Sequence, residues 1–151
     1  MKTLTTIAVL LAALTPALTA QPGRPAAASG GNIQQTTNII NDCEKRTNQF
    51  KKTLDKALAR DNVRAGQARE DQLNRDAGNL ENQLDKVGDS WNKNHSIDQT
   101  RQHVTVAIGF ANDINKAMRT WKMGGDAESE WTALRGELNR LANTFGTPRI
   151  R

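Results

Sequence analysis

Two twelve-residue stretches, LENQLDKVGDSW (residues 80–91) and LRGELNRLANTF (residues 134–145), decide the fold of this chain. Each has apolar residues at its first, fifth and eighth positions and an aromatic residue at its twelfth. Steps of three and four residues place side chains along one side of an α-helix. Both stretches therefore predict amphipathic helices whose apolar sides must be covered by other helices.

Two further segments show the same spacing, so the chain carries four apolar stripes. From residue 32 onward there is no proline before Pro148, and β-branched residues form no alternating runs, so helix is the only periodicity present. In the third stripe Arg101 occupies a position where an apolar residue is expected. The stripes comprise Ile40, Cys43, Thr47, Phe50, Leu54 and Ala57; Leu73, Ala77, Leu80, Leu84, Val87 and Trp91; Ile97, Val104, Ile108, Ala111, Ile114, Met118 and Trp121; and Ala127, Trp131, Leu134, Leu138, Leu141 and Phe145.

Short polar or glycine-containing breaks separate the stripes, at residues 61–66, 92–96 and 124–126. Ser96 and Gln99 have the spacing of a helix-capping box, and Gly146 followed by Pro148 is typical of a helix end. Short connections force neighbouring helices to run antiparallel. We therefore predict an all-α fold, an antiparallel four-helix bundle over residues 32–147, followed by a C-terminal tail at residues 148–151.

The two quoted stretches also align under one shift of the sequence. Moving the second half back by 54 residues places Leu134 on Leu80 and Phe145 on Trp91, and the same shift places Val104 on Phe50. This match suggests a duplicated helical hairpin. Amphipathic periodicity alone produces similar matches, so the alternative is two unrelated pairs of helices.

The N-terminal residues have the order of a secretory signal peptide. Lys2 precedes an apolar run over residues 7–14, Pro16 follows, and small residues lead up to Ala20. The run is too short to span a bilayer as a helix. We predict cleavage after Ala20, with a retained membrane anchor as the alternative, and a flexible linker rich in proline, glycine and alanine over residues 21–31. The expected location is secreted or periplasmic.

The charge of the chain gives weak information about partners. The formal net charge is +5, and the signal segment removes one positive charge and no acid. Basic and acidic residues alternate closely after residue 41, so no face is uniformly basic. We expect no nucleic-acid partner. The expected partner is an unidentified envelope protein or a second copy of the chain, with no transmembrane segment in the mature chain.

Cys43 is the only cysteine, so it has no partner for a disulfide within the chain. In an oxidising compartment it can remain a free thiol, pair with another chain, or pack as a small hydrophobic residue. Its place on the first stripe favours the packed thiol.

No catalytic, cofactor-binding or metal-ligating residue is predicted, and no cofactor is expected. His95 and His103 are eight residues apart, without the carboxylate spacing of a di-metal bundle. A single cysteine excludes haem attached through a C-x-x-C-H motif. Acidic residues near expected helix starts complement the helix dipole without any catalytic role. The three tryptophans, which lie on the stripes near helix ends, are interpreted as core residues whose indole N–H groups bond turn carbonyls; an aromatic cage is the alternative.

The chain resembles a family of uncharacterised exported acidobacterial proteins with a two-hairpin helical domain. The resemblance covers most of the chain from Phe50 onward and is sharpest in the pattern W-x-x-L-R-x-E-L-x-x-L-A, from Trp131 to Ala142. Family members often have tyrosine where this chain has Phe145. The resemblance implies export and a helical bundle, and it implies no activity.

These observations lead to a functional hypothesis of a non-enzymatic module of the cell envelope that acts in interaction or structure. One alternative is a periplasmic carrier of a small ligand, bound in a cavity between helices and lined by Trp121, Trp131 and Met118. A second alternative is a periplasmic chaperone-like protein.

Overall fold

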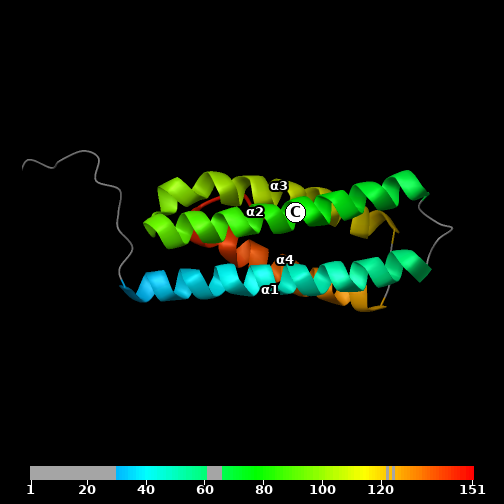
Figure 1. Ribbon diagram of the computed structural model, residues 1–151, viewed down its shortest axis with the longest axis horizontal. Helices are drawn as coiled ribbons and strands as arrows, with labels where there is room; N and C mark the ends of the chain where they lie inside the picture. The colour runs from blue at the N-terminus through cyan, green and yellow to red at the C-terminus, as the bar shows by residue number, and fades with distance from the viewer. Residues whose placement is uncertain (1–29, 61–65, 122, 124) are drawn as a thin grey trace, which may run out of the picture.

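The computed structural model describes residues 30–60, 66–121, 123 and 125–151, which form four helices. They are α1 (Gly30–Arg60), α2 (Gln67–Asn94), α3 (Ile97–Trp121) and α4 (Gly125–Phe145). Successive helices run in opposite directions and lie side by side along most of their length (Figure 1). The predicted antiparallel four-helix bundle is confirmed.

Each helix packs against two neighbours, and two pairs of helices lie diagonally across the bundle. α1 and α3 each pack closely against both α2 and α4, while the backbones of the diagonal pairs, α1 with α3 and α2 with α4, lie farther apart. The α2–α3 interface is the most extensive and the α3–α4 interface the least. The two diagonal pairs are those related by the 54-residue shift, an arrangement that a duplicated hairpin would produce. Duplication stays a prediction.

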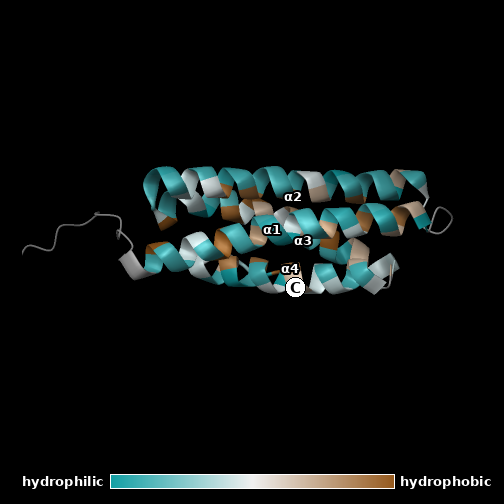
Figure 2. Cartoon of the chain, turned by 60° about the horizontal axis from the view of Figure 1, so that its bottom comes forward, coloured by the Kyte–Doolittle hydropathy of each residue, from teal (hydrophilic) through white to brown (hydrophobic). Residues whose placement is uncertain are grey.

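The four predicted stripes form the core. Nearly all their residues are buried in one apolar cluster, with Ala57, Ile97 and Trp121 partly buried at its edge. Hydrophilic residues cover much of the outer surface of the helices (Figure 2). The quoted stretches meet at their last residues, where the rings of Trp91 and Phe145 pack edge to face with centroids 5.7 Å apart.

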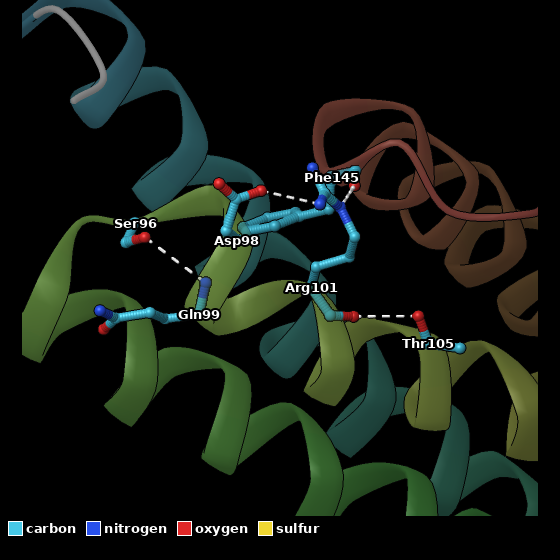
Figure 3. A network of polar contacts seen from close by, with 6 residues as sticks. All are labelled: Ser96, Asp98, Gln99, Arg101, Thr105 and Phe145. Atoms are coloured by element: carbon cyan, nitrogen blue, oxygen red, sulfur yellow. Dashed lines mark hydrogen bonds and ion pairs between the residues drawn. The ribbon is translucent and has the colours of Figure 1, made fainter. Parts of the chain in front are cut away.

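Arg101, the polar residue in the third stripe, ties the start of α3 to the end of α4 (Figure 3). Its Nε donates a hydrogen bond to the carbonyl oxygen of Phe145 at 2.8 Å. Its Nη1 donates to Asp98 Oδ1 at 2.7 Å. The last carbonyls of a helix lack partners within the helix and carry partial negative charge, so a guanidinium group there is favourable. This role explains why the stripe contains an arginine.

The start of α3 contains half of the predicted capping box. The backbone N–H of Gln99 donates to Ser96 Oγ at 3.4 Å, as expected for a helix-capping serine. The Gln99 side chain, drawn in Figure 3, makes no hydrogen bond to the backbone of Ser96 in the described structure. The serine therefore caps the helix without the reciprocal bond.

The end of α4 has the geometry of a Schellman motif. Gly146 has φ +63°, its N–H donates to the Asn143 carbonyl at 3.2 Å, and the N–H of Thr147 donates to the Ala142 carbonyl at 2.9 Å. The chain then turns back along the bundle. The expected tail is thus part of the fold, because Ile150 is only 7% exposed and belongs to the core cluster.

The N-terminal predictions fall mostly outside the described residues. The signal peptide (residues 1–20), its cleavage site and residues 21–29 of the predicted linker lie there. α1 begins at Gly30, so residues 30 and 31, which were expected in the linker, are helical. Among the described helices, none combines the length and apolar character needed to cross a membrane.

Replacing glycines within the helices should stabilise the bundle. A Cβ atom added at Gly109 or Gly136 meets nothing within 4 Å, so alanine adds helix propensity without a clash. We expect each of Gly109→Ala and Gly136→Ala to raise the free energy of unfolding by about 0.5–1 kcal/mol, measured by urea denaturation.

Gly146→Ala is the matched control, because alanine at its positive φ is strained and should cost about 1 kcal/mol. Equal effects at all three glycines would contradict this explanation.

Candidate functional site

Cys43 is a buried residue of the core. Its exposed fraction is 0%, and burial raises the pKa of its thiol far above the ordinary value, with the negative charges of Glu137 and Asp42 adding to the effect. The thiolate is the reactive form of cysteine, so a high pKa makes the side chain inert. The structure therefore supports the packed thiol. A disulfide to another chain would require the helices to separate.

Both histidines take part in contacts that hold the helices of the bundle. The amide nitrogen of Gln83 on α2 lies 3.1 Å from His103 Nδ1 and donates to the His103 carbonyl at 3.2 Å. His95 ends α2 in a left-handed conformation with φ 46°, and its N–H donates to the Trp91 carbonyl at 2.7 Å. One histidine thus links α2 to α3, and the other caps a helix.

The indole N–H groups of two tryptophans donate hydrogen bonds to side chains of neighbouring helices. The predicted acceptors were carbonyl groups of turns. Trp91 Nε1 donates to Thr37 Oγ1 at 3.0 Å, and Trp131 Nε1 donates to Asn115 Oδ1 at 3.1 Å. The prediction of core tryptophans was right for these two residues, and their predicted partners were wrong. Buried polar groups need partners, and a short hydroxyl or amide one helix away provides one.

A groove of about 440 Å³ lies between α2 and α3, near the start of α2 and the end of α3. Its apolar lining is Leu73, Ala117 and the half-buried ring of Trp121, and its polar lining is Arg69, Gln72, Asp76, Asp113, Lys116 and Thr120. Of the three residues predicted to line a carrier cavity, Trp121 lines this groove. Trp131 and Met118 are buried in the core and do not.

Asp76 is the one buried carboxylate of this groove, with an exposed fraction of 8%. Burial raises the pKa of its carboxyl group; the hydrogen bond that Gln72 Nε2 donates to Oδ1 at 2.8 Å opposes the rise, and Asp113 adds to it. Asp76, Asp113, Arg69 and Lys116 form no ion pair with any described residue. The groove therefore presents charges of both signs beside an aromatic ring.

A cluster of three carboxylates, Glu44, Asp85 and Asp89, lies where α1 packs against α2. A Cβ atom added at Gly88 would lie 2.6 Å from Glu44 Oε1, so the glycine makes room for this side chain. Burial raises the pKa of Glu44, and the nearby carboxylates of Asp85 and Asp89 raise it further. Three like charges gathered at one crossing weaken the bundle when all are ionised.

Within the part of the chain that the structure describes, no three or more His, Cys, Asp or Glu side chains are placed to hold a metal ion together. We take the α2–α3 groove, where charged side chains lie beside Trp121, as the candidate site. Sequence periodicity identifies the stripes that surround it, but the groove itself depends on residues outside the stripes, such as Arg69, Asp113 and Lys116.

Comparison of the chain with models of protein families, with curated proteins and with solved structures gave no match. The resemblance to exported acidobacterial proteins thus stays a prediction.

Neutralising Glu44 should stabilise the protein at neutral pH. An acid whose pKa is higher in the folded state favours folding at low pH, and this contribution is lost as pH rises through the folded-state pKa. Glu44→Gln should therefore be more stable than the parent chain above the ordinary pKa of 4.5, by a few tenths of a kcal/mol after screening by water (~0.3), with the difference vanishing at lower pH.

Glu81→Gln is the control for the Glu44 variant, measured by urea denaturation from pH 4 to 8. Glu81 is the ion-pair partner of Lys51, so its neutralisation should destabilise the fold slightly. A loss of stability in Glu44→Gln at pH 7 would show that the carboxylate is favourable and that the assignment is wrong.

Proposed function

We propose that this chain is an exported, non-enzymatic helical module of the secreted or periplasmic space, and that it binds another macromolecule of the cell envelope through the α2–α3 groove. The observation that carries the proposal is the groove itself, where charged side chains of both signs surround Trp121. Tryptophan and arginine are enriched at the centres of protein interfaces, because each combines a large contact area with hydrogen-bonding groups.

Charge supports the choice of groove. The charged groups of the groove form no ion pair among the described residues, so they are available to pair with charges of a partner. A partner that presents opposite charges at Asp113 and Lys116 would supply both electrostatic complementarity and burial of the Trp121 ring.

The non-enzymatic part of the proposal is supported by the roles of the residues best suited to chemistry. The Cys43 thiol is buried, His103 lies against Gln83 between two helices, and His95 ends α2. The side chains of Cys43 and His103 and the backbone of His95 therefore each take part in the fold. The export part is supported by the order of charge, apolar run and small residues at the N-terminus, and by the resemblance to exported proteins.

A second candidate function is a small-ligand carrier, and the volume of the groove favours it. About 440 Å³ lies within the range of small-molecule sites, roughly 300–1,000 Å³. The ligand would then be an organic molecule stacked on Trp121. Its site would be on the outside of the bundle, away from Trp131 and Met118.

Export predicts a defined mature N-terminus. When the full chain is expressed in a bacterium with a secretory pathway, the protein found outside the cytoplasm should have the mass of the chain that begins at Gln21. This follows because cleavage is predicted after Ala20. Intact-mass measurement of the periplasmic and culture fractions tests this. Ala20→Asp, which removes the small residue before the cut, should block processing there. A full-length chain that remains in the membrane would contradict the prediction.

Binding at the groove predicts position-dependent crosslinking. A photoreactive phenylalanine analogue at Ala117, in the groove, should form an adduct with an envelope protein in cells. The same group at Lys52, an exposed site on α1 across the bundle, should form none. Charge reversal by Asp113→Lys or Lys116→Glu should reduce the adduct at position 117 by roughly fivefold or more.

The crosslinking result separates the candidates. Equal adducts at both positions would contradict binding through the groove. An adduct of small mass at position 117, removed by Trp121→Ala, would instead support the carrier.

A further inference from the structure

The α2–α3 groove has a negative charge at its buried floor, and its positive charges are exposed. Among the residues that line it, Leu73 and Asp76 are buried, with exposed fractions of 1% and 8%, and the ring of Trp121 is half-buried. Arg69 and Lys116 are exposed. Water and salt screen exposed charges more than buried ones. The floor of the groove therefore favours a positive charge on a bound group.

The carboxylate of Asp76 is held in one orientation by its neighbours on α2. Arg75 Nη2 donates to Gln72 Oε1 at 2.9 Å, and Gln72 Nε2 donates to Asp76 Oδ1 at 2.8 Å. Asp76 Oδ2 accepts no hydrogen bond from a described residue. Because no fully buried side-chain oxygen of the described residues lacks a partner, Oδ2 is accessible at the groove that Asp76 lines. It can accept a hydrogen bond from a bound group.

Asp113 contributes a second carboxylate from the opposite helix. Burial raises the pKa of the Asp76 carboxyl group, and the charge of Asp113 on α3 raises it further. The two carboxylates are thus within electrostatic reach of each other, and both line the groove. Neither forms an ion pair with a described residue. A cation bound between them would offset both the burial of Asp76 and the repulsion between the two charges.

The lining of the groove suits a guanidinium group better than an ammonium group. A guanidinium group is planar and weakly hydrated, so it can stack on an aromatic ring such as Trp121 while it donates hydrogen bonds to carboxylate oxygens. An ammonium group is compact and strongly hydrated, and it would lose more water beside Leu73 and Ala117. The volume of about 440 Å³ is in the size range of sites for small organic groups.

We propose that the α2–α3 groove binds the side chain of an arginine of the partner protein, with the guanidinium group between Asp76 and Asp113 and against the ring of Trp121. This inference rests on the proposed function, because it names the group that the partner inserts into the same groove. Arginine is also enriched at the centres of protein interfaces. Arg69 and Lys116 then pair with acidic groups that surround this arginine on the partner.

Nuclear magnetic resonance of the ¹⁵N-labelled protein tests the inference with defined probes. The probes are blocked pentapeptides with glycines on both sides of a central arginine, citrulline, lysine or glutamate. The readout is the indole N–H signal of Trp121, assigned with Trp121→Phe. The indole signals of Trp91 and Trp131 are internal references, because their N–H groups are bonded to Thr37 and Asn115 away from the groove.

The arginine peptide should shift the Trp121 signal saturably, with a Kd of about 1–10 mM for so small a ligand. Citrulline has nearly the shape of arginine without its charge, and its peptide should bind roughly tenfold more weakly. The lysine peptide should bind roughly threefold more weakly, and the glutamate peptide should cause no saturable shift. Equal affinity for arginine and citrulline, or tighter binding of lysine or glutamate, overturns the proposal.

Aspartate variants locate the charge that binds the peptide. Asp76→Asn keeps the shape of the side chain and should weaken binding of the arginine peptide roughly tenfold. Asp113→Asn should weaken it roughly threefold, because this carboxylate is exposed. Asp55→Asn, at an exposed aspartate on α1, is the matched control and should leave the affinity unchanged. Unmoved reference indole signals establish that each variant is folded. Unchanged affinity in folded Asp76→Asn overturns the proposal.

The crosslinking experiment at Ala117 separates this inference from the proposed function. An adduct with an envelope protein, together with a Trp121 signal that does not respond to the arginine peptide, contradicts the arginine inference alone. Specific binding of the arginine peptide without any adduct in cells supports a guanidinium site and contradicts the macromolecular partner. If both hold, Asp76→Asn should reduce the adduct at position 117 severalfold.

Discussion

The structure depends on one constraint: the apolar stripes of four helices must all be covered at once, and only the other helices of the bundle can cover them. Because the stripes fill the interior, any polar group at their edges must find its partner on an adjacent helix. Trp91 bonds Thr37, Trp131 bonds Asn115, and Arg101 reaches the end of α4. In the described residues no buried side-chain nitrogen or oxygen lacks a hydrogen-bond partner. These bonds fix the register of helices whose apolar contacts alone permit sliding.

Periodicity made the fold predictable, because the apolar spacing of each stripe recurs over about five to seven turns of helix. Leu80, Leu134 and Phe145 could be assigned to the core from spacing alone, and the structure places them there. Ile150 could not, since a single apolar residue after a proline has no period. The signal that could have identified it is the concentration of asparagine at residues 112, 115, 139 and 143, on the two helices that hold residues 149–151. A sequence does not reveal which asparagines face each other.

The candidate sites were less predictable for the same reason. The α2–α3 groove combines residues of the second stripe, the third stripe and the polar sides of both helices, so only tertiary packing brings Asp76, Asp113 and Trp121 together. Lys116 and Thr120 line both this groove and a second hollow that Arg151 also lines. This part of α3 therefore contributes to both hollows.

Amide hydrogen exchange at increasing denaturant tests most directly whether the four helices form a single cooperative core. The account predicts that interior amides of α1, α2, α3 and α4 exchange with one common free energy of opening, while Ile150 and Arg151 open at a lower one, because only side-chain amides hold their N–H groups. Loss of protection in α1 alone, with α2, α3 and α4 still protected, would contradict it.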